Sequence, residues 1–213
     1  MVATAKQSSR NKAGREVLYF DVPEKTGIVS VIGADTDLGA NMVKHLSDAG
    51  KTVYGFSQEK DFKFSLRPIS EHEMGKTDYP PHPILSDWLV LCIDPRMGFE
   101  KYTSRIRNLC NYLYRKKYRG DILLFSSTEI CQPDEDGITE KSLVAPRTEV
   151  GLCLATAENI LNVMLYKDGN EVLPHVLRLG NTEIDEACKK AIELMNMDFC
   201  PVLAVICQIT HHV

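Results

Sequence analysis

The sequence predicts one α/β domain with a doubly wound, mostly parallel sheet and helices on both faces. Short apolar runs typical of buried strands alternate with segments of helical spacing along most of the chain. The first apolar run, at residues 27–33, ends in a glycine turn that opens a helix. The 213 residues, of which 44% are hydrophobic and 25% charged, suit one globular domain with a large core.

Each element is expected from its own local pattern. Uninterrupted β-branched and large apolar residues predict strands at residues 27–33, 52–56, 88–93, 121–125, 176–179 and 202–209. Apolar residues spaced three or four apart predict helices at residues 38–49, 98–117, 147–167 and 184–197. Residues 1–25 are expected to form a partly disordered tail ahead of a domain at 26–213. The proline-containing residues 57–83 are expected to be irregular, with the option of one short strand.

Composition argues against several classes of protein. A net charge of −4 gives no general attraction to nucleic acid or to anionic membranes. No apolar stretch approaches the roughly 20 residues that span a bilayer, and no apolar signal segment is visible near the start. The seven cysteines contain no C-x-x-C pair, which indicates reduced, buried thiols rather than a metal site. We therefore expect a cytoplasmic protein without a metal, a nucleic-acid partner or a membrane anchor.

The glycine turn is the first candidate site. It reads Gly33-Ala34-Asp35-Thr36-Asp37-Leu38-Gly39, in a position where backbone amides of a helix N-terminus can approach a phosphate. Candidate cofactor-binding residues are the turn positions and the end of the next strand, namely Gly33, Asp35, Thr36, Asp37, Leu38, Gly39, Ser57 and Gln58. The two aspartates would repel a pyrophosphate, whereas the Thr36 hydroxyl could donate to one.

The cofactor itself stays open at this point. The second strand ends in Gly55-Phe56-Ser57-Gln58, which has neither a carboxylate for an adenosine ribose nor an arginine for a 2′-phosphate. NAD, NADP and a turn that no longer binds a dinucleotide are all compatible with this sequence.

A second motif follows the strand at residues 121–125. The sequence Ser126-Ser127-Thr128-Glu129-Ile130-Cys131 resembles the strand end Ser-Ser-Thr-Glu-Val-Tyr of the extended short-chain dehydrogenase/reductase family, the NAD-dependent epimerase/dehydratase-like proteins. The resemblance implies a Rossmann-type, NAD(P)-binding-like fold. It also implies that Ser127, with Thr128, lies against the reacting part of a substrate.

The helix that follows matches the same family at four positions but lacks the family's two catalytic side chains. Pro146, Thr148, Gly151 and Glu158 fall in register with the family pattern P-x-S-x-Y-G-x-S-K-x-x-x-E, and these residues extend the resemblance. The family's tyrosine, which is the general acid/base, is replaced by Val150, and its lysine is replaced by Leu154. Neither side chain can carry a proton. Ser127 is then a residual catalytic position, and we expect it to act mainly as a strand-end or capping hydroxyl.

The last part of the chain continues the resemblance and then departs from it. Arg178 and Asn181 match an R-x-x-N strand whose asparagine helps active members to bind a nucleotide-sugar, so both are candidate substrate residues. Roughly a hundred residues of substrate domain usually follow in the family, whereas about thirty follow here. We therefore expect a degenerate, truncated member without a separate substrate domain.

These features favour a non-catalytic protein that serves as a binding, regulatory or assembly module, in short a pseudoenzyme. A homodimer or a partner protein would contact the apolar helices at 98–117 and 147–167. The alternative is an NAD(P)-dependent oxidoreductase or nucleotide-sugar epimerase in which Asp94, Glu129 or a group of the substrate replaces the missing base. Asp94 precedes Pro95, so a helix cap is the competing interpretation of that residue. A third reading is a ligand sensor that keeps nucleotide affinity without turnover.

Overall fold

The computed structural model describes residues 5–10, 16–20, 27–58, 86–115, 117–133, 137–165, 172, 174–197 and 203–206. Most of the stretch expected to be irregular, residues 57–83, lies outside these ranges. Only its first two residues, Ser57 and Gln58, are described.

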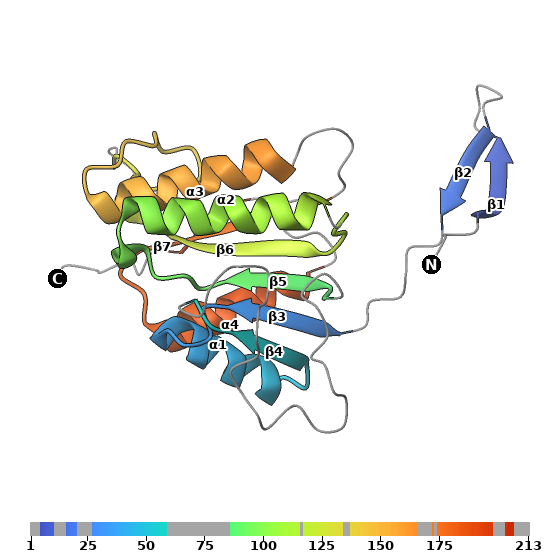
Figure 1. Cartoon of the computed structure of the whole chain (residues 1–213), viewed down its shortest axis with the longest axis horizontal. Helices are drawn as coiled ribbons and strands as arrows, with labels where there is room; N and C mark the ends of the chain where they lie inside the picture. Colours follow the sequence, from blue (N-terminus) through green and yellow to red (C-terminus); the bar gives the residue numbers. More distant parts are fainter. Residues whose placement is uncertain are drawn as a thin grey trace.

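A six-stranded sheet forms the centre of the molecule (Figure 1). In spatial order its strands are β4 (Thr52–Phe56), β3 (Ile28–Ile32), β5 (Trp88–Leu91), β6 (Asp121–Ser127), β7 (Pro174–Leu179) and β8 (Leu203–Ile206). All neighbouring strands pair in parallel. The predicted parallel sheet is therefore confirmed, and each predicted strand is present with ends that differ by a few residues.

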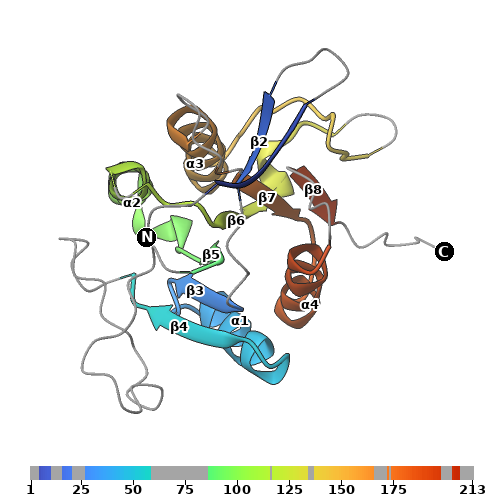
Figure 2. The same cartoon turned by 90° about the vertical axis from the view of Figure 1, so that its right-hand side faces the viewer.

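The helices cover both faces of this sheet (Figure 2). One face carries α1 (Asp37–Asp48) and α4 (Ile184–Met195), and the other carries α2 (Phe99–Arg115) and α3 (Glu149–Leu165). Two 3₁₀ turns, η3 (Pro95–Met97) and η4 (Thr128–Ile130), follow β5 and β6. The predicted doubly wound architecture is confirmed. None of the described helices is both long enough and apolar enough to cross a lipid bilayer.

Strand β6 shows how the sequence builds the two apolar layers. Side chains of successive strand residues point to opposite faces of a sheet. Ile122 and Leu124 belong to the layer under α2 and α3, while Leu123 and Phe125 belong to the layer under α1 and α4. All four side chains are buried, which explains why the sequence of this strand is a continuous run of apolar residues.

The cysteines of the described segments lie in these layers. All five of them are buried: Cys92, Cys110, Cys131, Cys153 and Cys188. The predicted burial of the thiols is confirmed for these five. Cys200 and Cys207 lie outside the described residues.

The order of the strands locates the place where a ligand would bind. The chain runs from β3 through α1 to β4 on one side, and then returns to β5 on the other side of β3. Strand order reverses at β3, and open parallel sheets bind ligands in the crevice outside the carboxyl ends of the strands at such a point. The glycine turn at 33–39 lies at this end of β3.

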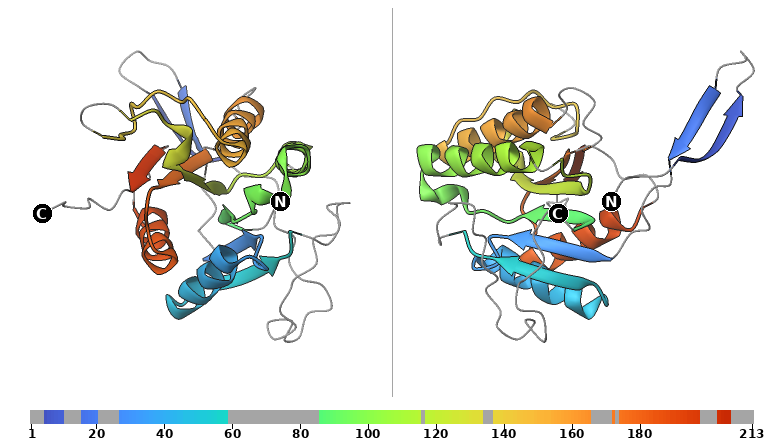
Figure 3. Two further views of the ribbon diagram at one scale, coloured as in Figure 1. Left: turned by 90° about the vertical axis from the view of Figure 1, so that its left-hand side faces the viewer. Right: turned by 45° about the vertical axis from the view of Figure 1, so that its right-hand side comes forward.

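The N-terminal segment contains regular structure of its own. Strands β1 (Ala5–Arg10) and β2 (Glu16–Phe20) pair antiparallel in a separate two-stranded sheet, drawn in dark blue in Figure 3. The tail expected at residues 1–25 therefore includes a pair of strands.

Candidate functional site

Two glycines of the turn are required by the packing of the backbone on itself. Gly33 has a φ of +86°, and a Cβ on it would lie 2.5 Å from the carbonyl oxygen of Cys92. A Cβ on Gly39 would overlap the carbonyl oxygen of Gly33. Both positions therefore need glycine to let the turn approach β5 and close on α1, whether or not a ligand binds.

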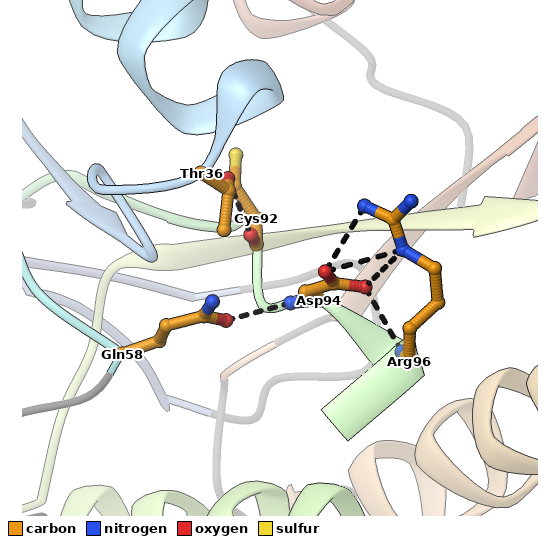
Figure 4. Close-up of polar contacts among 5 residues, drawn as sticks. All are labelled: Thr36, Gln58, Cys92, Asp94 and Arg96. Atoms are coloured by element: carbon orange, nitrogen blue, oxygen red, sulfur yellow. Dashed lines mark hydrogen bonds and ion pairs between the residues drawn. The ribbon is translucent and has the colours of Figure 1, made fainter. Parts of the chain in front are cut away.

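Thr36 lies between the two glycines of the turn, and its hydroxyl forms hydrogen bonds within the protein (Figure 4). It caps α1 by accepting a hydrogen bond from the Gly39 amide at 3.0 Å. It also donates toward the carbonyl oxygens of Gly33, at 2.8 Å, and of Cys92, at 3.0 Å. A hydrogen bond from this hydroxyl to a phosphate would therefore have to replace one of these contacts.

Substitution of Thr36 tests this role. Thr36→Ala removes the helix cap and the link to Cys92, so we expect the free energy of unfolding to fall by about 1–2 kcal/mol. Thr36→Ser keeps the hydroxyl and should lose less than half as much. Urea unfolding of the two variants measures the difference, and equal losses would contradict the assigned hydrogen bonds.

Asp35 connects the turn to the end of β4. Its carboxylate accepts hydrogen bonds from the Ser57 hydroxyl at 2.5 Å and from the Gln58 amide at 2.8 Å. The turn thus places a carboxylate beside the end of β4, whose own last residues include none. The sequence alone did not reveal these contacts. Ser57 and Gln58 are 22 and 23 residues from Asp35 in the chain, and only the pairing of β3 with β4 brings them close to it.

The other turn positions divide into exposed and packed residues. Asp37 is exposed in the first turn of α1, where a carboxylate suits the helix dipole. Leu38 is partly buried and packs against the layer under α1 and α4. The side chain of Leu38 therefore has a packing role, which leaves its backbone amide as the group that could face a ligand.

Gln58 and Asp94 join the ends of β4 and β5. The Gln58 side-chain oxygen accepts a hydrogen bond from the Asp94 amide at 2.8 Å. Asp94 caps η3 by accepting from the Arg96 amide at 2.9 Å, and it forms a two-pronged ion pair with the Arg96 guanidinium at 3.0–3.2 Å. The capping interpretation of Asp94 is confirmed. The hydrogen bond from Arg96 lowers the pKa of Asp94, which keeps this carboxylate ionised and a weak base.

The pH dependence of this pair follows from the lowered pKa. The stability that the ion pair supplies is present above the ordinary aspartate pKa of about 3.9 and is lost as the pH falls through the lower, folded value. A carboxyl carbon NMR titration should show Asp94 ionising below pH 3.9 in the wild type. In Arg96→Ala the midpoint should rise. Asp185 is the control, because its pKa is lowered mainly by the hydrogen bond from Lys189. Its titration midpoint should be the same in Arg96→Ala as in the wild type.

Ser127 and Glu129 lie where β6 ends. Ser127 caps η4 by accepting from the Glu129 amide at 3.1 Å, so the predicted capping role is confirmed. The Glu129 carboxylate is exposed and accepts from the Thr148 hydroxyl at 3.3 Å. Thr148 in turn accepts from the Gly151 amide at 2.9 Å at the start of α3. Thr128 lies in η4 and is half-buried.

The positions of the family's tyrosine and lysine lie in an apolar environment. Val150 packs against the layer under α2 and α3, and Leu154 is part of that layer with 5% of its surface exposed. Tyr102 of α2 belongs to the same layer, and its hydroxyl has no hydrogen-bond partner among the described residues. Burial, with smaller contributions from Cys153 and Glu158, raises the pKa of Tyr102. Tyr102 therefore cannot exchange a proton readily in place of the missing tyrosine.

Two of the charged residues that match the family motifs, Glu158 and Arg178, bind each other. Glu158 of α3 and Arg178 of β7 form a buried ion pair, with contacts of 2.7 Å to Nη2 and 3.1 Å to Nε of the arginine. The remaining nitrogen, Nη1, donates to the Cys131 sulfur at 3.4 Å. The Arg178 side chain thus links α3 to β7, and only 4% of the surface of this residue is exposed. Asn181, which follows β7, is exposed.

The described surface also has a depression that is lined by none of the candidate site residues. An open depression of about 620 Å³ lies where α2 begins, next to the start of α3. It is lined by Met97, Gly98, Phe99, Glu100, Lys101, Ser104 and Glu149. Within the described ranges, no three histidine, cysteine or acidic side chains gather as metal ligands would.

Comparison with known proteins identifies the class of fold. No family model matches the sequence, and no curated protein matches it either. Solved structures do match, and among them are an NAD-dependent dehydratase, an epimerase and a short-chain dehydrogenase/reductase. At identities below 25% these matches establish the fold, which is the Rossmann-type fold that the motifs predict.

Three of these structures illustrate the similarity. TunA, an NAD-dependent NDP-hexosamine 5,6-dehydratase of tunicamycin biosynthesis, is 13% identical with a TM-score of 0.61, over 84% of this chain and 75% of TunA. UDP-N-acetylglucosamine 4-epimerase from Bacillus cereus is 18% identical with a TM-score of 0.60, over 84% and 77%. A short-chain dehydrogenase/reductase from Vibrio parahaemolyticus is 15% identical with a TM-score of 0.56, over 84% and 98%. Against several longer structures this chain spans 48–55% of the length.

Proposed function

We propose that this protein is a non-catalytic binding or regulatory module built on the epimerase/dehydratase fold. The observation that carries the proposal is the apolar pair Val150 and Leu154 at the start of α3. Leu154 is buried and Val150 packs on the same layer, so neither position offers an acid, a base or a ribose donor. Hydride transfer that needs deprotonation of an alcohol has no group there to accept the proton.

The pattern of retained residues supports the same proposal. Glu158 and Arg178 hold α3 on β7, and Gly33 and Gly39 allow the close turn, so the residues that build the fold are kept. The positions that would carry chemistry have become apolar. This division is what we expect of a protein selected for its shape and its contacts rather than for turnover.

NAD or NADP is the ligand class that the fold suggests for such a module. TunA is described as NAD-dependent, and nicotinamide dinucleotides bind this fold at the turn after the first strand. Ser57, Gln58 and the turn residues 33–39 are the groups of this chain that would face the dinucleotide. Thr128 and Asn181 remain the candidate contacts for a second ligand at the ends of β6 and β7.

The helices α2 and α3 are the surface that we propose for a second copy or a partner protein. Tyr114, Leu152 and Val163 are large apolar side chains on these helices that are 46–60% exposed. Burial of such side chains in an interface removes apolar surface from water. A cytoplasmic location is part of the proposal, since five cysteines buried in the apolar layers suit a reducing compartment.

One observation favours a working enzyme as the alternative. Glu129 is an exposed carboxylate that contacts Thr148 near the start of α3 and lies two residues after Ser127. In an NAD(P)-dependent oxidoreductase or nucleotide-sugar epimerase it could accept the proton in place of the tyrosine.

Turnover assays separate the two candidates. Purified protein is incubated with NAD and either UDP-glucose or UDP-N-acetylglucosamine, and NADH formation and sugar epimerisation are followed. We expect no turnover by the wild type. Turnover that is lost in Glu129→Gln, and kept in the exposed control Glu183→Gln, would overturn the non-catalytic proposal. Activity gained by Val150→Tyr/Leu154→Lys alone would show that the base and the lysine are the missing parts.

A further inference from the structure

The carboxyl end of β3 is crossed by the protein's own side chains (Figure 4). Gln58 follows the end of β4, Asp94 follows the end of β5, and β3 lies between these two strands. The hydrogen bond from the Asp94 amide to the Gln58 side chain, at 2.8 Å, therefore spans the end of β3. That is the crevice in which a sheet of this topology binds its ligand.

Further contacts hold this crossing in place. The Gln58 amide donates to Asp35 at 2.8 Å, so the residue is fixed at its backbone by the turn and at its side chain by β5. Asp94 is oriented by its ion pair with Arg96. The Thr36 hydroxyl makes a second link, to the Cys92 carbonyl oxygen at 3.0 Å.

We propose that Gln58 is a strap that closes the nucleotide crevice, and that a dinucleotide binds only after the hydrogen bond between Gln58 and Asp94 opens. This inference rests on the proposed function as a nucleotide-binding module. It extends that function, because it makes ligand binding conditional on a change of partners at one identified contact. The ligand class is a nucleotide with a diphosphate group.

The charges at this edge indicate how a diphosphate could compete with Asp94 for Arg96. Asp35, Asp37 and Asp94 are carboxylates at this edge, and they oppose the approach of a diphosphate. Arg96 is the neighbouring cation, and its side chain is 78% exposed although it pairs with Asp94. An incoming diphosphate can draw Arg96 away from the Asp94 carboxylate, which removes the ion pair that orients the residue whose amide donates to Gln58.

The affinity for NADH tests the strap directly. Gln58→Ala removes one hydrogen bond that must break before binding, so we expect NADH to bind about fivefold more tightly than to the wild type, by fluorescence titration. Gln58→Glu keeps an acceptor for the Asp94 amide and adds a negative charge, so its affinity should be equal or lower. Gln132→Ala, an exposed glutamine in another loop, is the matched control and should leave the affinity unchanged.

A structural readout accompanies the titration. The Asp94 amide should exchange its hydrogen faster in Gln58→Ala than in the wild type, and its NMR signal should shift when NADH is added to the wild type. Equal or weaker binding by Gln58→Ala than by the wild type would overturn the strap and leave the proposed nucleotide binding standing. No binding by either protein at millimolar NADH would overturn both the strap and the proposed nucleotide binding. Turnover by the wild type would overturn only the proposal that the protein is non-catalytic.

Discussion

Replacement of Arg178 by methionine is expected to lower the free energy of unfolding by about 3–5 kcal/mol. The reason is the buried ion pair with Glu158, whose contacts are 2.7 and 3.1 Å long between residues that are 4% and 7% exposed. Removal of the arginine leaves an unpaired carboxylate inside the layer under α3. The loss is measured by urea unfolding near neutral pH.

Two further proteins make this result specific. Glu158→Leu combined with Arg178→Met removes both charges, and we expect its stability to return to within about 1 kcal/mol of the wild type. Lys190→Met breaks an exposed ion pair with Glu193 and should cost no more than about 1 kcal/mol. A similar small loss for Arg178→Met would show that Glu158 and Arg178 do not form the buried contact.

Gly39→Ala is expected to destabilise the protein by about 3 kcal/mol, or to prevent folding. The added Cβ would overlap the carbonyl oxygen of Gly33, and a backbone atom cannot move aside as a flexible side chain can. Thermal and urea unfolding give the size of the loss. Ser47→Ala, at an exposed position of the same helix, is the control and should change stability by less than about 0.5 kcal/mol. Equal stability of Gly39→Ala and wild type would contradict the tight turn.

The strands and helices could be predicted because their signals are local. The apolar run before Gly33 and the helical spacing after it identify β3 and α1 without knowledge of any neighbour. The cap formed by Asp94 was also visible, since Pro95 follows it directly. Such features depend on residues a few positions apart, and the structure confirms them with small shifts at the ends of the elements.

The partners of the site residues could not be predicted in the same way. Asp35 meets Gln58 because β3 and β4 pair in a particular register, and the sequence does not state that register. Arg178 was matched to a family motif and assigned to substrate, whereas its guanidinium binds Glu158 and Cys131. The motif included both Glu158 and Arg178, but it did not show that they are partners.

The position of β3 between β4 and β5 has a consequence for how the chain folds. Its pairing with β4 is local, because α1 alone separates the two strands, whereas its pairing with β5 joins Val29 to Trp88. During synthesis the β3–α1–β4 unit therefore leaves the ribosome well before the strand that completes its sheet. Closure of the β3–β5 contact, which spans about sixty residues, is expected to be the slow step that joins the two halves.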